Sequence, residues 1–137
     1  MPLYLTTLAP ERSTEAQRAA IAACITEVHV DVTGAPVQFV NTFFGASESA
    51  ADLFEPLPPG RVALVNGGIR AGRPPEAKAE MIDRIARGVA DALGCDAEEV
   101  AVVLHPAPAQ HGMEGGELLP EPGSPEESAW KAKGVSA

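Results

Sequence analysis

The first part of the chain changes from a strand-like to a helix-like hydrophobic pattern and back again. Residues 3–8 alternate between apolar and polar side chains, as in a half-buried β-strand. Ser13 or Thr14 is a suitable cap for the helix that follows. Gly34 predicts the end of this helix, and residues 37–44 are predicted to form a second strand. The predicted helix carries one apolar stripe at three- and four-residue steps: Ile21, Cys24, Ile25, Val28 and Val32.

The second part of the chain repeats this order of elements. Residues 62–65 form an apolar run typical of a strand, which continues into a glycine-containing segment. Pro74 and Pro75 predict a helix start, Gly94 predicts its end, and residues 100–104 form another apolar strand. The apolar stripe of this second helix consists of Met81, Ile82, Ile85, Val89 and Leu93.

Two consecutive βαβ units of similar length predict an α/β (α+β) fold. Each unit places two parallel strands in the sheet and a crossover helix on its face. We therefore expect a four-stranded mixed sheet with two helices on one face. The length of 137 residues fits a single domain. Its expected parts are a first βαβ unit (2–44), a connector (45–60), a second βαβ unit (61–105), and a loop with a C-terminal tail (106–137).

The charge and cysteine content narrow the classes of partner. A formal net charge of −9 disfavours nucleic acid and anionic membranes as partners, because both would be repelled. No apolar run approaches the length of a membrane span, and no targeting segment is visible, so we expect a cytoplasmic protein. Cys24 and Cys95 have no paired spacing and are interpreted as reduced thiols. Trp130, in the polar tail, is either a surface residue or an anchor onto another subunit, and we favour the anchor because tryptophan is enriched at interfaces.

Pro2 is the first candidate for chemistry. If Met1 is removed, Pro2 carries a free secondary amine at the start of a predicted buried strand. A free α-amino group has a reference pKa of about 7.7–8.0, and burial lowers it by disfavouring the charged form. Such an amine can accept or donate a proton near neutral pH. If Met1 is retained, the same nitrogen is an amide without this ability.

Three further residues are candidates for a functional site, and two of them, Arg70 and Arg73, are candidates to bind an anion. His29 lies on the apolar side of the first predicted helix, where a histidine is either a core residue or part of a buried site. Arg70 and Arg73 leave a predicted strand and directly precede a helix start. Arginine binds carboxylates through two parallel hydrogen bonds, and a helix N-terminus favours negative charge. Solvated loop arginines are the alternative interpretation.

Glu114 lies between glycines, where its carboxylate is either solvent-facing or able to act as a base for water. A metal site formed by His105, His111 and Glu114 is a weaker alternative, because these residues lack a zinc-ligand spacing. The glycines around Ile69 match neither a dinucleotide-binding nor a phosphate-binding motif. The sequence therefore predicts no cofactor and no metal.

Taken together, Pro2, the two βαβ halves, His29, the segment Arg70-Ala71-Gly72-Arg73 and Glu114 resemble the tautomerase superfamily. The branch that the chain resembles is that of cis-3-chloroacrylic acid dehalogenase, through 25–29, 33–34, 108–110 and 119–123. The resemblance implies a cofactor-free homotrimer. It also implies that the proline is the catalytic amine and that the histidine and both arginines hold a substrate carboxylate.

The resemblance further implies that Glu114 activates water in the members that hydrate their substrates. This chain has Val103 where the dehalogenase has a tyrosine that assists the water. Valine neither donates nor accepts a hydrogen bond, which disfavours hydration.

The function expected first is therefore a cofactor-independent tautomerase that moves a proton in a small 2-oxo acid or enol carboxylate. Pro2 carries the proton, while His29, Arg70 and Arg73 bind the substrate carboxylate. A weak cis-3-haloacrylate dehalogenase or hydratase that depends on Glu114 is the second expectation. A non-enzymatic trimeric protein that binds small anions is the third, and it applies if Met1 is retained.

Overall fold

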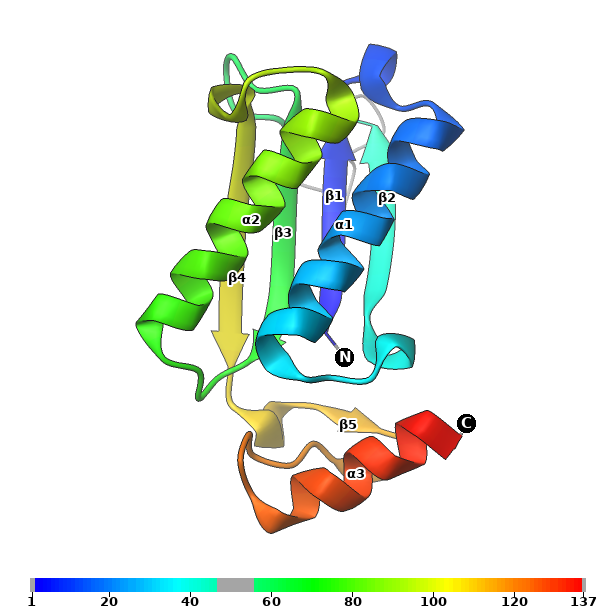
Figure 1. Cartoon of the computed structure of the whole chain (residues 1–137), viewed down its shortest axis with the longest axis vertical. Coiled ribbons are helices and arrows are strands. Elements are labelled where there is room, and N and C mark those ends of the chain that lie inside the picture. Colours follow the sequence, from blue (N-terminus) through cyan, green and yellow to red (C-terminus); the bar gives the residue numbers. More distant parts are fainter. Residues whose placement is uncertain (1, 47–55, 137) are drawn as a thin grey trace.

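The computed structural model places the two βαβ halves of the chain side by side in one sheet (Figure 1). It describes residues 2–46 and 56–136. Residues 47–55, which make up much of the predicted connector 45–60, lie outside the described residues. The described residues show how the two halves join, because the first strand of each half lies antiparallel to the other at the centre of the sheet.

The strand order in this four-stranded sheet is β2-β1-β3-β4. β1 (Leu3–Leu8) pairs in parallel with β2 (Asn41–Ala46) and antiparallel with β3 (Ala63–Arg70). β3 pairs in parallel with β4 (Val100–Ala107). The mixed sheet predicted from the two βαβ units is confirmed. The strands of the second half are longer than predicted, because the sheet pairing continues through the glycines of β3 and through Pro106 of β4.

Two helices, α1 (Glu15–Thr33) and α2 (Pro75–Leu93), cover one face of the sheet (Figure 1). The Thr14 side chain caps the start of α1 by accepting a backbone hydrogen bond. Gly34 and Gly94 end the two helices in the left-handed conformation, with φ values of 69° and 64°. The helix boundaries predicted from caps and glycines are therefore confirmed.

The core lies between the two helices and the sheet. The apolar stripes point into it as predicted, except that Ile82 on α2 is 36% exposed. Cys24 and Cys95 are free thiols at the margin of this core. The residues buried here with no exposed surface include Tyr4, Leu8, Ile21, Ile25, Val65, Met81, Ile85 and Val89.

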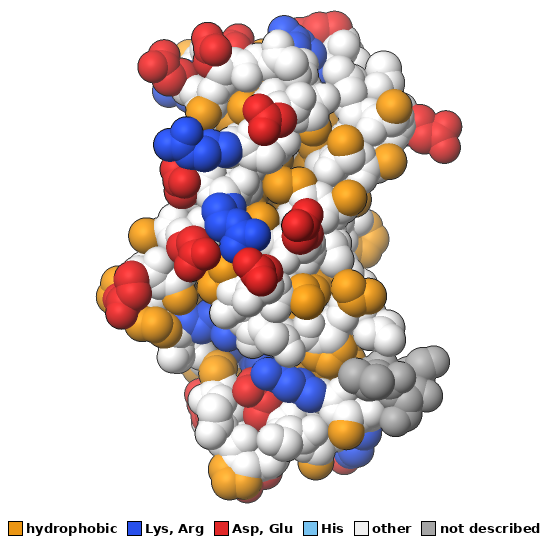
Figure 2. Space-filling view, viewed as in Figure 1, with side chains coloured by type: hydrophobic (Ala, Val, Ile, Leu, Met, Phe, Trp, Pro, Cys, Tyr) orange, Lys and Arg blue, Asp and Glu red, His pale blue; other side chains and the backbone are white. Residues whose placement is uncertain are grey.

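Charged side chains are interspersed over the outer surface of the helices (Figure 2). Arg84 on α2 bridges to Asp31 on α1 at 2.6 Å, across the helix–helix contact. No helix among residues 2–46 and 56–136 is long and apolar enough to cross a membrane.

The other face of the sheet carries a row of neighbouring residues, one from each strand: Phe43, Leu5, Asn66 and Val103. These residues alternate along their strands with residues that face the helices, so they point to the opposite side. Phe43 is 50% exposed and Val103 41% exposed, which leaves apolar surface on this side of the sheet.

The C-terminal segment forms an additional layer below the sheet (Figure 1). It contains a short hairpin of β5 (Met113–Glu114) and β6 (Glu117–Leu118), followed by α3 (Pro125–Ser136). The expected loop and C-terminal tail over 106–137 therefore contain a hairpin and a helix that the sequence pattern did not indicate. The pattern gave little signal for α3, because its contact with the rest of the chain depends on few apolar residues.

Two further expectations are wrong for one shared reason. The second strand begins at Asn41 rather than Val37, because Val37–Phe39 form a turn of 3₁₀-helix. Phe39 then packs against Trp130 of α3, with ring centroids 4.2 Å apart. Trp130 is 7% exposed within this single chain, so it anchors α3 to its own subunit rather than to another.

Candidate active site

Pro2 lies buried at the start of β1, the strand between β2 and β3. Its carbonyl accepts a hydrogen bond from the backbone N–H of Asn41 at 3.2 Å, which fixes it to the neighbouring strand. The side-chain alternation of a strand places Pro2 on the same face as Tyr4. The predicted catalytic position is therefore held on a central, rigid element of the fold.

His29 points from α1 toward this strand and is 1% exposed. Its Nδ1 shares a hydrogen bond of 2.7 Å with the hydroxyl of Tyr4, and the two rings meet edge to face with centroids 5.7 Å apart. Burial, together with the positive charges of Arg73 and Arg70, lowers the pKa of His29 to about 3. The imidazole is therefore neutral near neutral pH.

Burial raises the pKa of Tyr4, so its hydroxyl keeps its proton. A tyrosine hydroxyl that donates to Nδ1 leaves the single proton of a neutral imidazole on Nε2. In that tautomer His29 can donate a hydrogen bond to a substrate oxygen. Its contribution to the site is then a neutral donor rather than a positive charge.

Arg70 is the last residue of β3 and is 7% exposed. Its Nη2 donates to the carboxylate of Glu127 at 2.6 Å, and its Nη1 donates to the carbonyl of Pro120. The guanidinium also lies over the ring of Trp130, 4.8 Å from the centroid. The C-terminal segment therefore surrounds an arginine that the sequence predicted to bind substrate.

Arg73 follows Arg70 by one short loop, in which Gly72 has a φ of 107° that favours glycine. The side chain is partly buried, and its Nε is buried without a hydrogen-bond partner. Burial, followed by the neighbouring charge of Arg70, lowers the pKa of Arg73. An unpaired buried donor on a cation is the kind of group that an anionic ligand satisfies.

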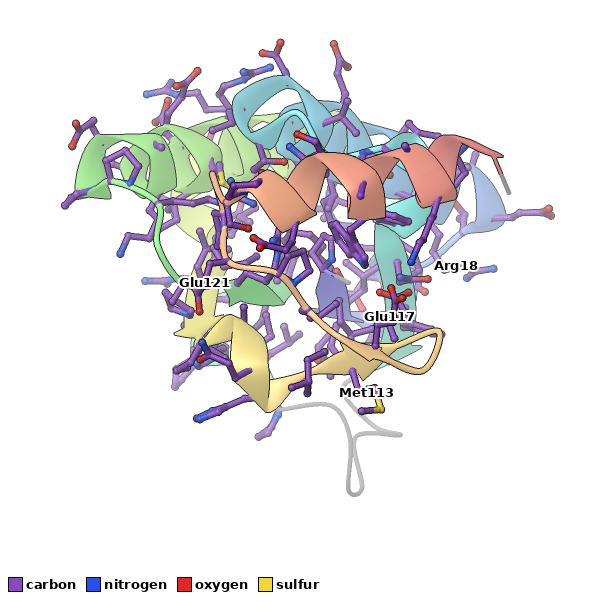
Figure 3. All side chains as sticks on the ribbon, turned by 90° about the horizontal axis from the view of Figure 1, so that it is seen from below. Arg18, Met113, Glu117 and Glu121 are labelled. Carbon is purple, nitrogen blue, oxygen red and sulfur yellow. The ribbon has the colours of Figure 1, made fainter. Side chains whose placement is uncertain are left out.

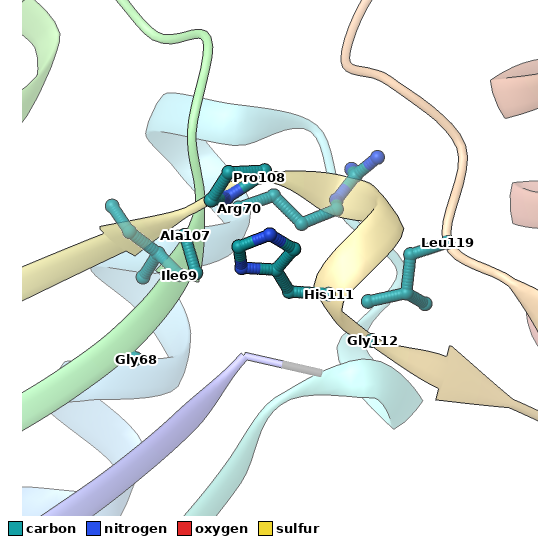
Figure 4. Close-up of a pocket in the computed structure, with 8 residues that line it drawn as sticks. All are labelled: Gly68, Ile69, Arg70, Ala107, Pro108, His111, Gly112 and Leu119. Carbon is teal, nitrogen blue, oxygen red and sulfur yellow. The ribbon is translucent and has the colours of Figure 1, made fainter.

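A small pocket of about 110 Å³ opens at the same end of the sheet (Figure 4). Gly68 in its wall is the register partner of Leu3, the residue after Pro2. His111 lies at the pocket, and the rest of the lining is largely apolar. The complete lining consists of Gly68, Ile69, Arg70, Ala107, Pro108, His111, Gly112 and Leu119.

Glu114 lies on the hairpin below the sheet and is exposed in this chain. Its neighbour Met113 lies on the hairpin away from the sheet (Figure 3). His105 pairs with Asn66 at 2.6 Å, on the face of the sheet opposite the helices. The described residues contain no group of three or more His, Cys, Asp or Glu side chains that could hold a metal ion.

The structure thus places Pro2, His29, Arg70 and Arg73 at one end of the sheet, and Glu114 on the hairpin of the C-terminal segment. The sequence pattern did not indicate Tyr4 and Glu127 as site residues. For Tyr4 a signal was available, since the only tyrosine of the chain follows Pro2 by two strand positions. For Glu127 the sequence offered no signal, because the residue lies in an acidic stretch typical of solvent-exposed segments.

The comparisons with known proteins agree with this arrangement. Residues 1–134 match the family described as putative oxalocrotonate tautomerase enzyme. The chain therefore belongs to this tautomerase family. No curated protein matched the chain.

Solved structures show the same fold. The crystal structure of N1, a member of the cis-3-chloroacrylic acid dehalogenase family, is 26% identical with a TM-score of 0.79, over 98% of this chain and 99% of that chain. A fused 4-OT, solved as a symmetric trimer, is 29% identical with a TM-score of 0.70, over 85% and 94% of the two chains. A malonate semialdehyde decarboxylase inhibited by 3-bromopropiolate is 23% identical, covers 82% and 88%, and shares the fold with a TM-score of 0.65.

Proposed function

We propose that this protein is a cofactor-independent tautomerase that interconverts the enol and keto forms of a small 2-oxo acid. The observation that carries the proposal is the burial of Pro2 at the end of the sheet where the segment 70–73, here called the arginine loop, meets a pocket. Removal of Met1 turns the nitrogen of Pro2 into a secondary amine in this environment. Family membership supports the class of reaction but does not name the substrate.

In the proposed reaction the neutral amine of Pro2 accepts the proton of the enol hydroxyl. The oxygen becomes a carbonyl, and the electron pair of the carbon–carbon double bond takes a proton from the ammonium of Pro2 at C3. The amine is thereby regenerated. Arg70 and Arg73 favour its neutral form through like-charge repulsion, which suits a base.

The other side chains bind and orient the substrate in this proposal. The arginine loop binds the carboxylate, and neutral His29 donates a hydrogen bond to the 2-oxo or enol oxygen. Tyr4 holds the imidazole in the required orientation through its hydrogen bond to Nδ1. The apolar pocket accommodates the carbon chain of the substrate.

We also propose a homotrimer. The fused 4-OT relative was solved as a symmetric trimer, and the exposed apolar row on the sheet of this chain is a suitable subunit contact.

Dehalogenation or hydration of a cis-3-haloacrylate is a second candidate, supported by the similarity to a cis-3-chloroacrylic acid dehalogenase family member. That reaction needs an activated water. Val103 supplies no hydroxyl, and Glu114 is exposed in the single chain, so we rank this activity below tautomerisation. Chloride release from cis-3-chloroacrylate at a rate comparable to tautomerisation would reverse the order.

The test combines intact mass with kinetics on phenylenolpyruvate. We expect a mass that corresponds to loss of Met1, and a kcat/KM for the Pro2→Ala variant that is lower by about 10²-fold or more. Its melting temperature and oligomeric state should match those of the parent protein. A retained Met1 would favour the non-enzymatic anion-binding alternative, and unchanged turnover in the variant would remove Pro2 from the mechanism.

A further inference from the structure

Glu127 places a carboxylate at a site that is expected to bind the carboxylate of a substrate. Its carboxylate is largely buried and accepts hydrogen bonds on both oxygens. Oε2 binds Arg70 at 2.6 Å, while Oε1 binds the backbone N–H of Gly123 at 3.2 Å and lies 3.2 Å from the ammonium of Lys131. Although burial opposes ionisation, these bonds lower the pKa of Glu127 below its ordinary value.

We propose that Glu127 holds Arg70 out of substrate binding, so that Arg73 is the arginine that binds the substrate carboxylate. This inference rests on the proposed function, since it assigns roles within the same site. It makes Glu127 a positioning residue that acts on the substrate through Arg70.

The contacts of Arg70 leave little of its guanidinium available to a ligand. Both terminal nitrogens donate within the chain, one to Glu127 and one to Pro120. One face of the group is covered by Trp130, and the side chain is 5% exposed. A substrate carboxylate that approached Arg70 would compete with an internal carboxylate that is already desolvated and bound.

Arg73 has the opposite properties. Its Nε is buried without a partner, and the residue as a whole is less buried than Arg70. It lies close enough to influence the pKa values of both His29 and Tyr4. Arg73 is therefore the arginine with hydrogen-bonding capacity left at the polar end of the site.

The charges of the cluster lead to the same assignment. Glu127 compensates Arg70 at close range, while Arg73 forms no ion pair in the described part of the chain. Lys131 contacts the other side of Glu127, but its side chain is 27% exposed and is more strongly screened by water. His29 is neutral, and Arg73 lies close enough to lower its pKa while forming no ion pair among the described residues.

This assignment and a merely structural role for Glu127 predict different changes in ligand affinity when the carboxylate is removed. If Glu127 only supported the fold, its removal would weaken ligand binding or leave it unchanged. If Glu127 withholds Arg70, its neutralisation releases a second cation toward the ligand, and binding becomes tighter.

The experiment measures binding of 3,3-dimethyl-2-oxobutanoate by isothermal titration calorimetry. This 2-oxo acid has no hydrogen on C3 and therefore binds without tautomerising. The variant is Glu127→Gln, and the matched control is Glu117→Gln, which removes an exposed carboxylate that also contacts α3 through Lys133 at 2.6 Å. We expect Kd to decrease by about three- to tenfold in the first variant and to stay within about twofold in the control.

A rescue experiment tests the role of Arg73. Arg73→Met should raise Kd by about tenfold or more, and the double variant Arg73→Met with Glu127→Gln should recover about threefold of this loss, because Arg70 is released. If Glu127→Gln did not fold, Glu127→Asp would weaken the same contact while keeping the charge, with a smaller decrease in Kd. Unchanged or weaker binding in the Glu127 variants, or no effect of Arg73→Met, would overturn the proposal.

Turnover of phenylenolpyruvate by the same samples separates this inference from the proposed function. Turnover without tighter binding in the Glu127 variant would reject the role of Glu127 and retain the tautomerase. Tighter binding without turnover would retain the role of Glu127 in an anion site and reject the tautomerase.

Discussion

His29 shows how burial changes the chemistry of a single residue. An exposed histidine has a pKa of about 6.5 and carries charge in part of the physiological range. Here burial, together with two nearby arginines, lowers the pKa of His29 to about 3. The imidazole is therefore neutral between pH 6 and pH 9, and in the proposed mechanism a change of activity in this range would report the amine of Pro2 instead.

The lowered pKa of His29 predicts a loss of stability in acid. The unfolded chain binds a proton on this residue below about pH 6.5, whereas the folded chain binds it only near pH 3. The free energy of unfolding should therefore fall as the pH decreases from 6.5 toward 3, by about 2 kcal/mol between pH 7 and pH 5. Urea titrations of the parent protein and of His29→Gln measure this, and the variant should have the flatter profile. Parallel profiles would contradict the assignment.

At the scale of elements, the contact between β1 and β3 positions the buried polar residues. Gly67 is the register partner of Tyr4, and a Cβ at this position would lie 2.6 Å from the tyrosine ring. At Gly68 the nearest atom to such a Cβ is a backbone oxygen at 3.7 Å, which is an ordinary contact. Two adjacent glycines in one strand thus differ in the space that they leave.

Gly67→Ala should lower the free energy of unfolding by about 1–3 kcal/mol, because Tyr4 is buried and held by His29. Gly68→Ala is the matched control. It should change stability by less than about 1 kcal/mol, since alanine fits there and reduces the conformational freedom of the unfolded chain. Chemical denaturation of both variants gives the comparison. Equal effects would show that the close approach at Gly67 is not the cause.

The docking of α3 is a second property at this scale. Trp130 contacts Phe39 and Arg70, and it forms a small cluster with Leu119 and Ala109 away from the main core. The buried contacts of α3 thus include one aromatic residue and one ion pair, and an exposed ion pair joins Lys133 to Glu117. This attachment brings Glu127 to the site.

Trp130→Ala should lower the free energy of unfolding by about 3–5 kcal/mol, if α3 unfolds together with the rest of the chain. Leu118→Ala on the neighbouring hairpin is the control, since Leu118 is 57% exposed and should contribute less than about 0.5 kcal/mol. Hydrogen exchange measured by mass spectrometry would locate the change, with faster exchange in residues 125–136. An unchanged exchange rate in this range would contradict the anchoring role of Trp130.

At the scale of the whole molecule, the uncovered face of the sheet is the basis of the proposed subunit contact. Val103 lies in the row that also contains Phe43, on the side opposite the helices. The helical side instead carries interspersed acidic and basic side chains (Figure 2).

Val103→Lys should convert the proposed trimer largely to smaller species, because it places a charge in an apolar contact. Ile82→Lys is the matched control, since Ile82 is similarly exposed but lies on the helical side. Sedimentation velocity gives the distribution of species for each variant. A trimer that survives the substitution at Val103 would place the subunit contact elsewhere.

The sequence by itself determined the two βαβ units, their helix ends and the candidate residues at the site. These features depend on local chemistry: the period of apolar residues, the caps, and glycines such as Gly34 that adopt the left-handed conformation. The parallel strand pairs of the mixed sheet followed from two consecutive βαβ units. The strand order, and with it the central position of the strand that follows Pro2, came from the structure.

Only the tertiary structure decided which polar groups meet. Tyr4 binds His29 across 25 residues, and Arg70 binds Glu127 across 57 residues, so neither pair leaves a local pattern. The start of β2 and the placement of Trp130 were likewise set by a contact between distant segments. Burial then determined the charge of His29 and the availability of each arginine, because both depend on how much water and how many partners surround a side chain. Periodicity reports the face that a residue occupies, whereas the chemistry of this site depends on what the other elements bring to that face.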